Sequence, residues 1–250
     1  SRRIVLAAVF VAGFCALALE VLWTRLLVFV LETSVYAFAC MLTCFIFGLA
    51  VGSLISSRFL VPRLKNPMFG LGVVELLLAL SVAGSIPLLG LLWHIDLFVI
   101  GHVVDPHVSF FMDMVVHFLD ALAVTFLPTV LMGMVFPLAV QFCAPVWDTV
   151  SRRVGQVYAW NTMGCVVGSF LAGFVLIPQL GLRTSFFLIV GVLFLLGLAL
   201  ILHAARRRLL WVSSGSVVAA ALLVVGAWYA GPDVFLRTMN TYHYPSEIIF

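Results

Sequence analysis

Five ionisable side chains lie inside long apolar stretches of this chain, where they are the residues best placed to do chemistry. They are Glu20, Arg25, Asp113, His117 and Asp120. At about 100° per helical residue, Asp113, His117 and Asp120 fall within a sector of roughly 60° on one helix face. Charged groups are costly in hydrocarbon and normally have a partner or a function there. The five residues therefore predict a polar pocket between two membrane helices.

Two interpretations of this pocket stay open. Glu20 and Arg25 are about 140° apart on their own helix, so Arg25 is expected to face an acidic group on another helix. Asp113 and Asp120 are the candidates. In the structural interpretation, Arg25 neutralises one of them and locks two helices together. In the functional interpretation, the pocket is a proton or cation site, or the docking site of a cationic ligand.

A second polar pair, Glu75 and Asn161, lies in two other apolar stretches. One alternative is a hydrogen bond between them, and the other is a protonated or water-facing Glu75. Motifs for covalent haem, for nucleotide phosphates and for a nucleophilic serine are lacking in the 250 residues. The sequence accordingly predicts no catalytic, cofactor or metal site in this chain.

The composition is that of a membrane protein. Hydrophobic residues make up 64% of the chain and charged residues only 9%, whereas soluble proteins average about 25% charged residues. The mean hydropathy is +1.25. The cations are scattered over loops instead of gathering on one face, which argues against a nucleic-acid partner. The lipid bilayer is therefore the first expected partner.

The elements that position these residues are membrane-spanning helices, each of which needs about 20 apolar residues. We predict an all-α, polytopic transmembrane helix bundle of about seven spans in residues 1–230. The spans are 4–30, 35–57, 68–92, 110–141, 154–177, 183–203 and 209–230. Residues 231–250 are interpreted as the beginning of a soluble domain that these 250 residues do not include.

Positive charge alternates across these spans. Ten of the 13 Lys and Arg residues precede the first span or lie after the second, fourth and sixth spans. Basic loops stay on the cytoplasmic side, so we predict a cytoplasmic N-terminus and, after seven spans, a C-terminus outside. This orientation places the five residues of the polar pocket in the outer half of the membrane.

Small residues and prolines predict how the helices pack. Gly48 and Gly52, like Gly164 and Gly168, have the GxxxG spacing of close helix contacts. The similarity of GLAVGS (48–53) to GCVVGS (164–169) suggests an internal repeat of opposite orientation.

The fourth span contains Pro128 and Pro137. Each proline removes a backbone donor from the helix. They predict either a hinge or cavity wall, or a static kink that helps packing.

Three stretches resemble one protein family. They are GFCALALEVLWTRLLVFVLETSVYAFACMLTCFIFGLAVGS (13–53), FLPTVLMGMVFPLAV (126–140) and RRVGQVYAWNTMGCVVGSFLAGFVLIPQLGLR (152–183). They are similar to the membrane part of bacterial fused spermidine synthase-like proteins, which is often described as major-facilitator-like. The resemblance covers the first five spans, and the last two match only as apolar helices.

The resemblance implies a bacterial cytoplasmic membrane protein in which an aminopropyltransferase-like domain follows the membrane part. The ending TYHYPSEIIF (241–250) resembles the approach to that domain. The catalytic and cofactor-binding residues of such a domain have no counterpart in this chain. An outward tail conflicts with a cytoplasmic aminopropyl donor, so that domain uses another ligand, is a binding module, or follows a different number of spans.

Three functions stay open. The first is a membrane anchor and partner module of a spermidine synthase-like protein. The second is a transporter module for a small cation, a polyamine or a proton. The third is a structural subunit of a larger membrane complex, such as one in electron transfer, in which other membrane subunits are the partners.

The polar pocket predicts energetic coupling between Arg25 and Asp120. We expect the effects of Arg25→Ala and Asp120→Asn on the free energy of unfolding to be non-additive in the double variant. Removing either partner alone leaves the other charge unpaired in the membrane. The measurement is a double-mutant cycle on the free energy of unfolding in micelles, and a coupling of about 0.5–3 kcal/mol is expected. Purely additive effects would contradict the pairing.

Overall fold

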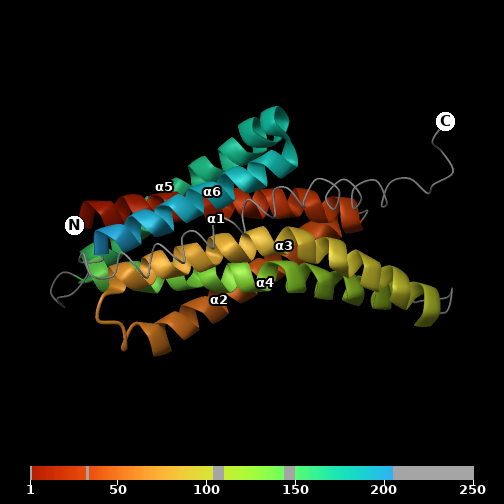
Figure 1. Cartoon of the computed structure of the whole chain (residues 1–250), viewed down its shortest axis with the longest axis horizontal. Helices are drawn as coiled ribbons and strands as arrows, with labels where there is room; N and C mark the ends of the chain where they lie inside the picture. The colour runs from red at the N-terminus through yellow and green to blue at the C-terminus, as the bar shows by residue number, and fades with distance from the viewer. Residues whose placement is uncertain (1, 32–33, 104–109, 144–149, 205–250) are drawn as a thin grey trace.

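The computed structural model describes residues 2–31, 34–103, 110–143 and 150–204. These residues form six α-helices and two π-helical turns, with no strand among them. In chain order the elements are α1 (Arg2–Leu31), α2 (Ser34–Ile55), η1 (Ser56–Leu60), α3 (Pro67–Val103), α4 (Phe110–Cys143), α5 (Val150–Leu171), η3 (Ala172–Leu176) and α6 (Ile177–Ala204). They lie side by side in one elongated bundle (Figure 1).

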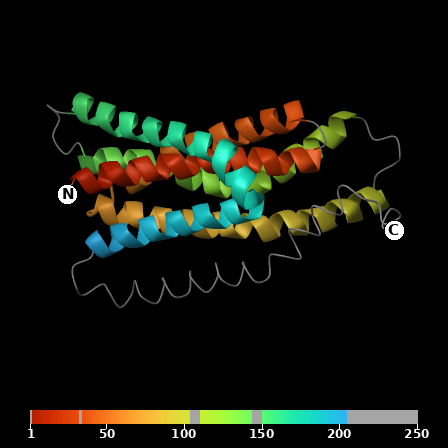
Figure 2. The same cartoon turned by 90° about the horizontal axis from the view of Figure 1, so that it is seen from above.

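Five segments of the described chain are long and apolar enough to cross a membrane. The last, Ser151–Ala204, has 54 residues, and a straight helix of that length would be about 80 Å long, more than twice the thickness of a bilayer core. It turns back on itself at Gly181, where φ is 75° and ψ is 166°, a conformation open mainly to glycine. Figure 2 shows α5 and α6 as the two arms of this turn.

The predicted all-helical membrane architecture is confirmed in this coarse form. The six described helices fall on the first six predicted spans. The seventh predicted span, 209–230, and the segment 231–250 lie outside the described residues. The number seven and the sides on which the termini lie therefore stay predictions.

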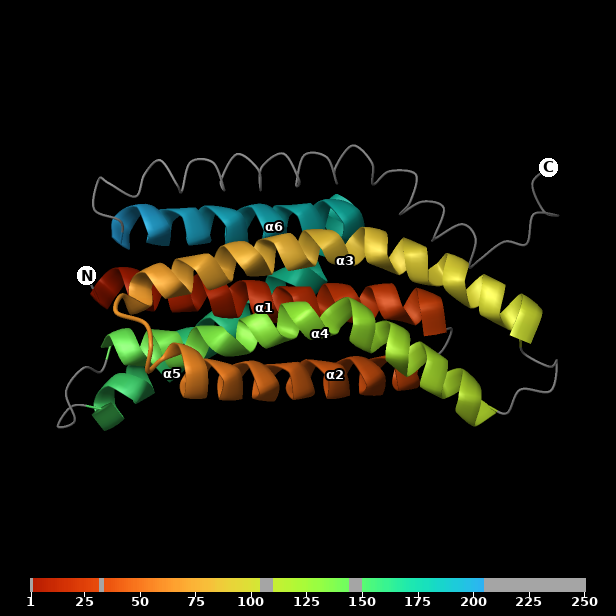
Figure 3. The same ribbon diagram turned by 60° about the horizontal axis from the view of Figure 1, so that its bottom comes forward.

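The helices pack chiefly in three pairs. α1 contacts α5 most extensively, α2 contacts α4, and α3 contacts α6. Figure 3 shows α2 and α4 running in the same direction beside each other, and α3 and α6 running in opposite directions. Glycine explains how closely the helices of each pair approach. In the α3–α6 pair, Gly72 and Gly197 lie against each other's carbonyls.

In the α2–α4 pair, glycines on both helices lie against the backbone of the other. Gly52 lies against the Val130 carbonyl, and Gly48 lies against the Thr129 side chain. From the other side, Gly133 lies against the Leu49 carbonyl. A Cβ atom at any of the three positions would overlap its neighbour. Because lipid is as apolar as the helices, such close approach is how the pair gains dispersion contacts.

The α1–α5 pair is built in the same way. Gly164 and Gly168 of α5 lie against the carbonyls of Phe10 and Phe14, and Gly13 of α1 lies against the backbone of α5. The two GxxxG segments therefore have equivalent roles in two different pairs. An internal repeat would relate α1, α2 and α3 to α4, α5 and α6, so the α1–α5 pair would correspond to the α4–α2 pair. The repeat would be inverted, because α1 and α4 run in opposite directions.

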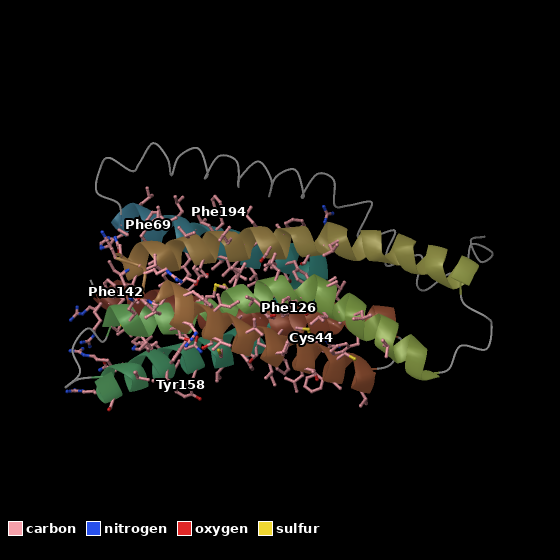
Figure 4. The ribbon with its side chains drawn as sticks, turned by 90° about the horizontal axis from the view of Figure 1, so that it is seen from below. Cys44, Phe69, Phe126, Phe142, Tyr158 and Phe194 are labelled. Atoms are coloured by element: carbon pink, nitrogen blue, oxygen red, sulfur yellow. The ribbon has the colours of Figure 1, made fainter. Side chains whose placement is uncertain are left out.

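Seven of the described cations lie at one end of the bundle, which we call the basic end. They are Arg2, Arg3, Arg58, Arg63, Lys65, Arg152 and Arg153. Figure 4 shows side-chain nitrogen atoms gathered there. Two side-chain amides tie this end together, since Gln141 donates to the Val61 carbonyl and Asn66 to the Ala204 carbonyl. The structure thus brings together the basic loops that the sequence assigned to one side.

The glycine contacts predict opposite effects for two substitutions on α5. Gly168→Ala should destabilise the bundle by about 1–3 kcal/mol, because its methyl group meets the Phe14 backbone, which cannot move without shifting α1. Gly155→Ala is the matched control. No atom lies within 4 Å of a Cβ placed there, so it should be neutral or stabilise by about 0.5–1 kcal/mol. Denaturant unfolding in micelles compares them, and equal effects would show that the contact is unimportant.

Candidate intramembrane site

A cavity of about 290 Å³ lies between the α1–α5 pair and the α2–α4 pair. Most of its wall is apolar, and α1, α2, α4 and α5 supply all of its lining residues except Leu78 of α3. Its polar lining residues are Ser53, Tyr158, Asn161 and Cys165. Small organic ligands bind in cavities of this kind, where a few polar groups set the orientation inside apolar walls.

The cavity lies in the half of the bundle nearer the basic end. Its wall takes residues 9–17 of α1, 45–53 of α2 and 132–136 of α4, and each of these ranges lies nearer the basic end of its helix. Tyr158 lines the cavity although it is 63% exposed. Figure 4 shows Tyr158 at the edge of the bundle, on α5. The cavity therefore opens sideways beside this tyrosine, whose ring packs edge-on against Phe136 with centroids 6.4 Å apart.

Asn161 supplies the amide of the cavity. Its Nδ2 group donates to the Cys165 sulfur across 3.8 Å. Gly13 makes room for this residue, because a Cβ there would lie 2.8 Å from the Asn161 Oδ1 atom. The same glycine that lets α1 approach α5 thus also accommodates the polar group of the cavity.

The wall contributed by α4 lies between its two prolines. Pro128 and Pro137 are inside an uninterrupted helix, and each leaves a backbone carbonyl without its usual donor. Hydroxyl groups bond backbone carbonyls in the same region. Thr129 donates to the Thr125 carbonyl across 2.9 Å, and Ser56 of η1 donates to the Met134 carbonyl across 3.1 Å. Met132, Gly133, Val135 and Phe136, which line the cavity, lie between the two prolines. Whether the prolines act as a hinge or as a static kink stays a prediction.

Glu75 does not form the hydrogen bond with Asn161 that was one alternative. Its side chain is 1% exposed, and its Oε2 atom has no hydrogen-bond partner within the described part of the chain. The Asn161 amide instead donates to Cys165. This burial favours the protonated alternative over the water-facing one. Glu75 is an enclosed carboxyl on α3, on the same helix face as Leu78 of the cavity wall.

The polar pocket predicted from the sequence stays a prediction. Asp113, His117 and Asp120 lie on α4, but their side chains are outside the described ones. On α1, Glu20 is half-buried and Arg25 is exposed. Neither forms an ion pair with any side chain that is described. α1 and α4 do contact each other, as the pocket requires.

The cavity itself was missed in the sequence. Its signal was present on α5, where Tyr158, Asn161 and Cys165 are three and four residues apart and so share one helix face. A tyrosine and a cysteine are common in apolar stretches, so this spacing alone does not indicate a cavity. Only the contact of α5 with α1 shows that the face lines a cavity.

The described residues include no group of three or more His, Cys, Asp or Glu side chains arranged to hold a metal ion. Comparisons with protein families, with curated proteins and with solved structures each find no match for this chain. The function therefore has to be argued from the cavity and from the sequence resemblance.

Proposed function

We propose that this chain is the integral membrane module of a spermidine synthase-like protein, and that the cavity is where the module binds a small organic molecule. One observation carries the proposal. Of the 15 lining residues, all but Val9, Ala12 and Leu78 lie in the three stretches that resemble that family. The segments that carry the resemblance are thus also the segments that build the cavity.

The lining favours a neutral or amphiphilic molecule over a free polyamine. It offers an amide, a phenol, a hydroxyl and a thiol, and it contains no carboxylate. A polyamine carries several positive charges, and burying them without acidic partners would be costly. An amphiphile could place its apolar part among the aliphatic side chains and its polar end near Asn161.

The resemblance also supports an anchoring role, in which an aminopropyltransferase-like domain follows Phe250. The test is the coding sequence downstream of this residue. We expect it to continue into a glycine-rich α/β domain with acidic residues after its strands. A continuation into an unrelated fold would contradict this part of the proposal and leave the cavity unaffected.

Transport is the second candidate, and the wall between Pro128 and Pro137 favours it. Membrane helices tolerate interior prolines where neighbouring groups can satisfy the freed carbonyls, and the segment between these two prolines lines the cavity. Uptake of the cavity's ligand into liposomes by the full chain would support transport. Saturable binding without uptake would support a binding module alone.

Filling the cavity should abolish ligand binding. Ala16→Phe places a ring in the cavity, whereas the control Ala199→Phe places the same ring on an exposed position of α6. We propose to measure the thermal stability of the full chain in micelles with spermidine, with nucleosides and with short-chain amphiphiles. A compound present at 100 times its Kd stabilises a single-site protein by about 2.7 kcal/mol.

For the compound that binds, this stabilisation should disappear in Ala16→Phe and persist in Ala199→Phe. Equal stabilisation of both variants would place the binding site elsewhere. Stabilisation by spermidine alone would contradict the preference for a neutral or amphiphilic molecule.

A further inference from the structure

Glu75 is the only acidic or basic residue among the fully buried side chains of the described bundle. It lies on the inner face of α3, together with Leu71 and Leu78, which are 1% and 2% exposed. Its Oε2 atom is enclosed without a hydrogen-bond partner there. A carboxylate in this place would lack the water that normally stabilises its charge.

Among the described residues, the uncharged segments of two helices that pack against α3 supply no cation to Glu75. α4 and α6 pack against α3, and neither residues 121–143 of α4 nor residues 184–202 of α6 include an acidic, basic or histidine side chain. The ionisable residues of α4, which are Asp113, His117 and Asp120, all lie in the half of that helix away from the basic end. On α1, the ionisable group within electrostatic range is the thiol of Cys15, which is itself fully buried.

We propose that Glu75 is an intramembrane proton-binding site, in which the carboxyl group holds a proton while the bundle is closed around it. Binding converts a carboxylate and a proton into a neutral acid, which needs no cationic partner. The next residue on the same face, Leu78, is about 4.5 Å further along the helix and lines the cavity. The proton site therefore lies about one helical turn from Leu78 of the cavity wall.

The site does not depend on which molecule the cavity binds. Its function is to exchange a proton when water reaches this turn of α3. Intramembrane acids commonly serve as proton relays. Glu20 provides an internal comparison, because it is also an acid inside an apolar helix but is only half-buried.

The test uses dicyclohexylcarbodiimide, an apolar reagent, on the full chain in lipid vesicles. The O–H of a protonated acid adds across one C=N bond of the reagent, and rearrangement gives an acylurea that retains every atom of both molecules. Peptide mass spectrometry locates the adduct. We expect the adduct at Glu75. The total amount of adduct should fall at least tenfold in Glu75→Gln and change little in Glu20→Gln. A water-soluble carbodiimide should not label Glu75.

An infrared measurement keeps the proposal testable if the reagent cannot reach the site or Glu75→Gln does not fold. The wild-type chain should show the carbonyl band of a protonated acid, and this band should shift in heavy water and disappear at high pH. Where Glu75→Gln folds, the band should be lost in it and kept in Glu20→Gln. Absence of the band from the wild type, or its persistence in folded Glu75→Gln, would overturn the proposal.

Discussion

In hydrocarbon, helices gain nothing from the hydrophobic effect by contacting one another, so their packing depends on how closely the backbones can approach. Glycine sets that distance here. Gly48, Gly52 and Gly133 close the α2–α4 pair, and Gly13, Gly164 and Gly168 close the α1–α5 pair. At every one of these positions a Cβ atom would meet a backbone or side-chain atom of the neighbouring helix. Gly72 and Gly197 close the α3–α6 pair in the same way.

The cavity follows from the same constraint. Each pair is packed too tightly to leave space within it, and the space that remains lies between the pairs. Its polar groups come from α5 and from the basic-end half of α2, while α4 supplies an apolar wall between its prolines. Gly13 connects the two features, because its missing side chain gives both the close approach of α1 and the room for Asn161. The proposed binding site thus lies where the α1–α5 pair meets the α2–α4 pair.

The glycines lie at helix contacts inside the bundle, whereas most of the described cations lie at one end of it. The cations of Arg2, Arg58, Arg63 and Arg152 lie at the basic end, where loops reach water, and Glu75 is the single described carboxyl enclosed by helices. The cost of charge in an apolar medium explains both facts, since it drives cations to the ends and leaves an interior acid only its neutral form. Glu75 therefore differs from Glu20, the other acid whose side chain is described, which is only half-buried.

The amino-acid sequence by itself determined the class of fold, because apolar length and charge alternation are properties of each segment taken alone. It located the first six helices, although α3 continues to Val103, well beyond its predicted end at residue 92. The spacing of Gly48 with Gly52 and of Gly164 with Gly168 indicated close contacts. Tertiary structure decided which helices those glycines meet, that Glu75 is enclosed instead of bonded to Asn161, and that Tyr158 and Asn161 border a cavity. These depend on the position of one helix relative to another, and in lipid that position is set by the shapes of both surfaces, which no single segment encodes.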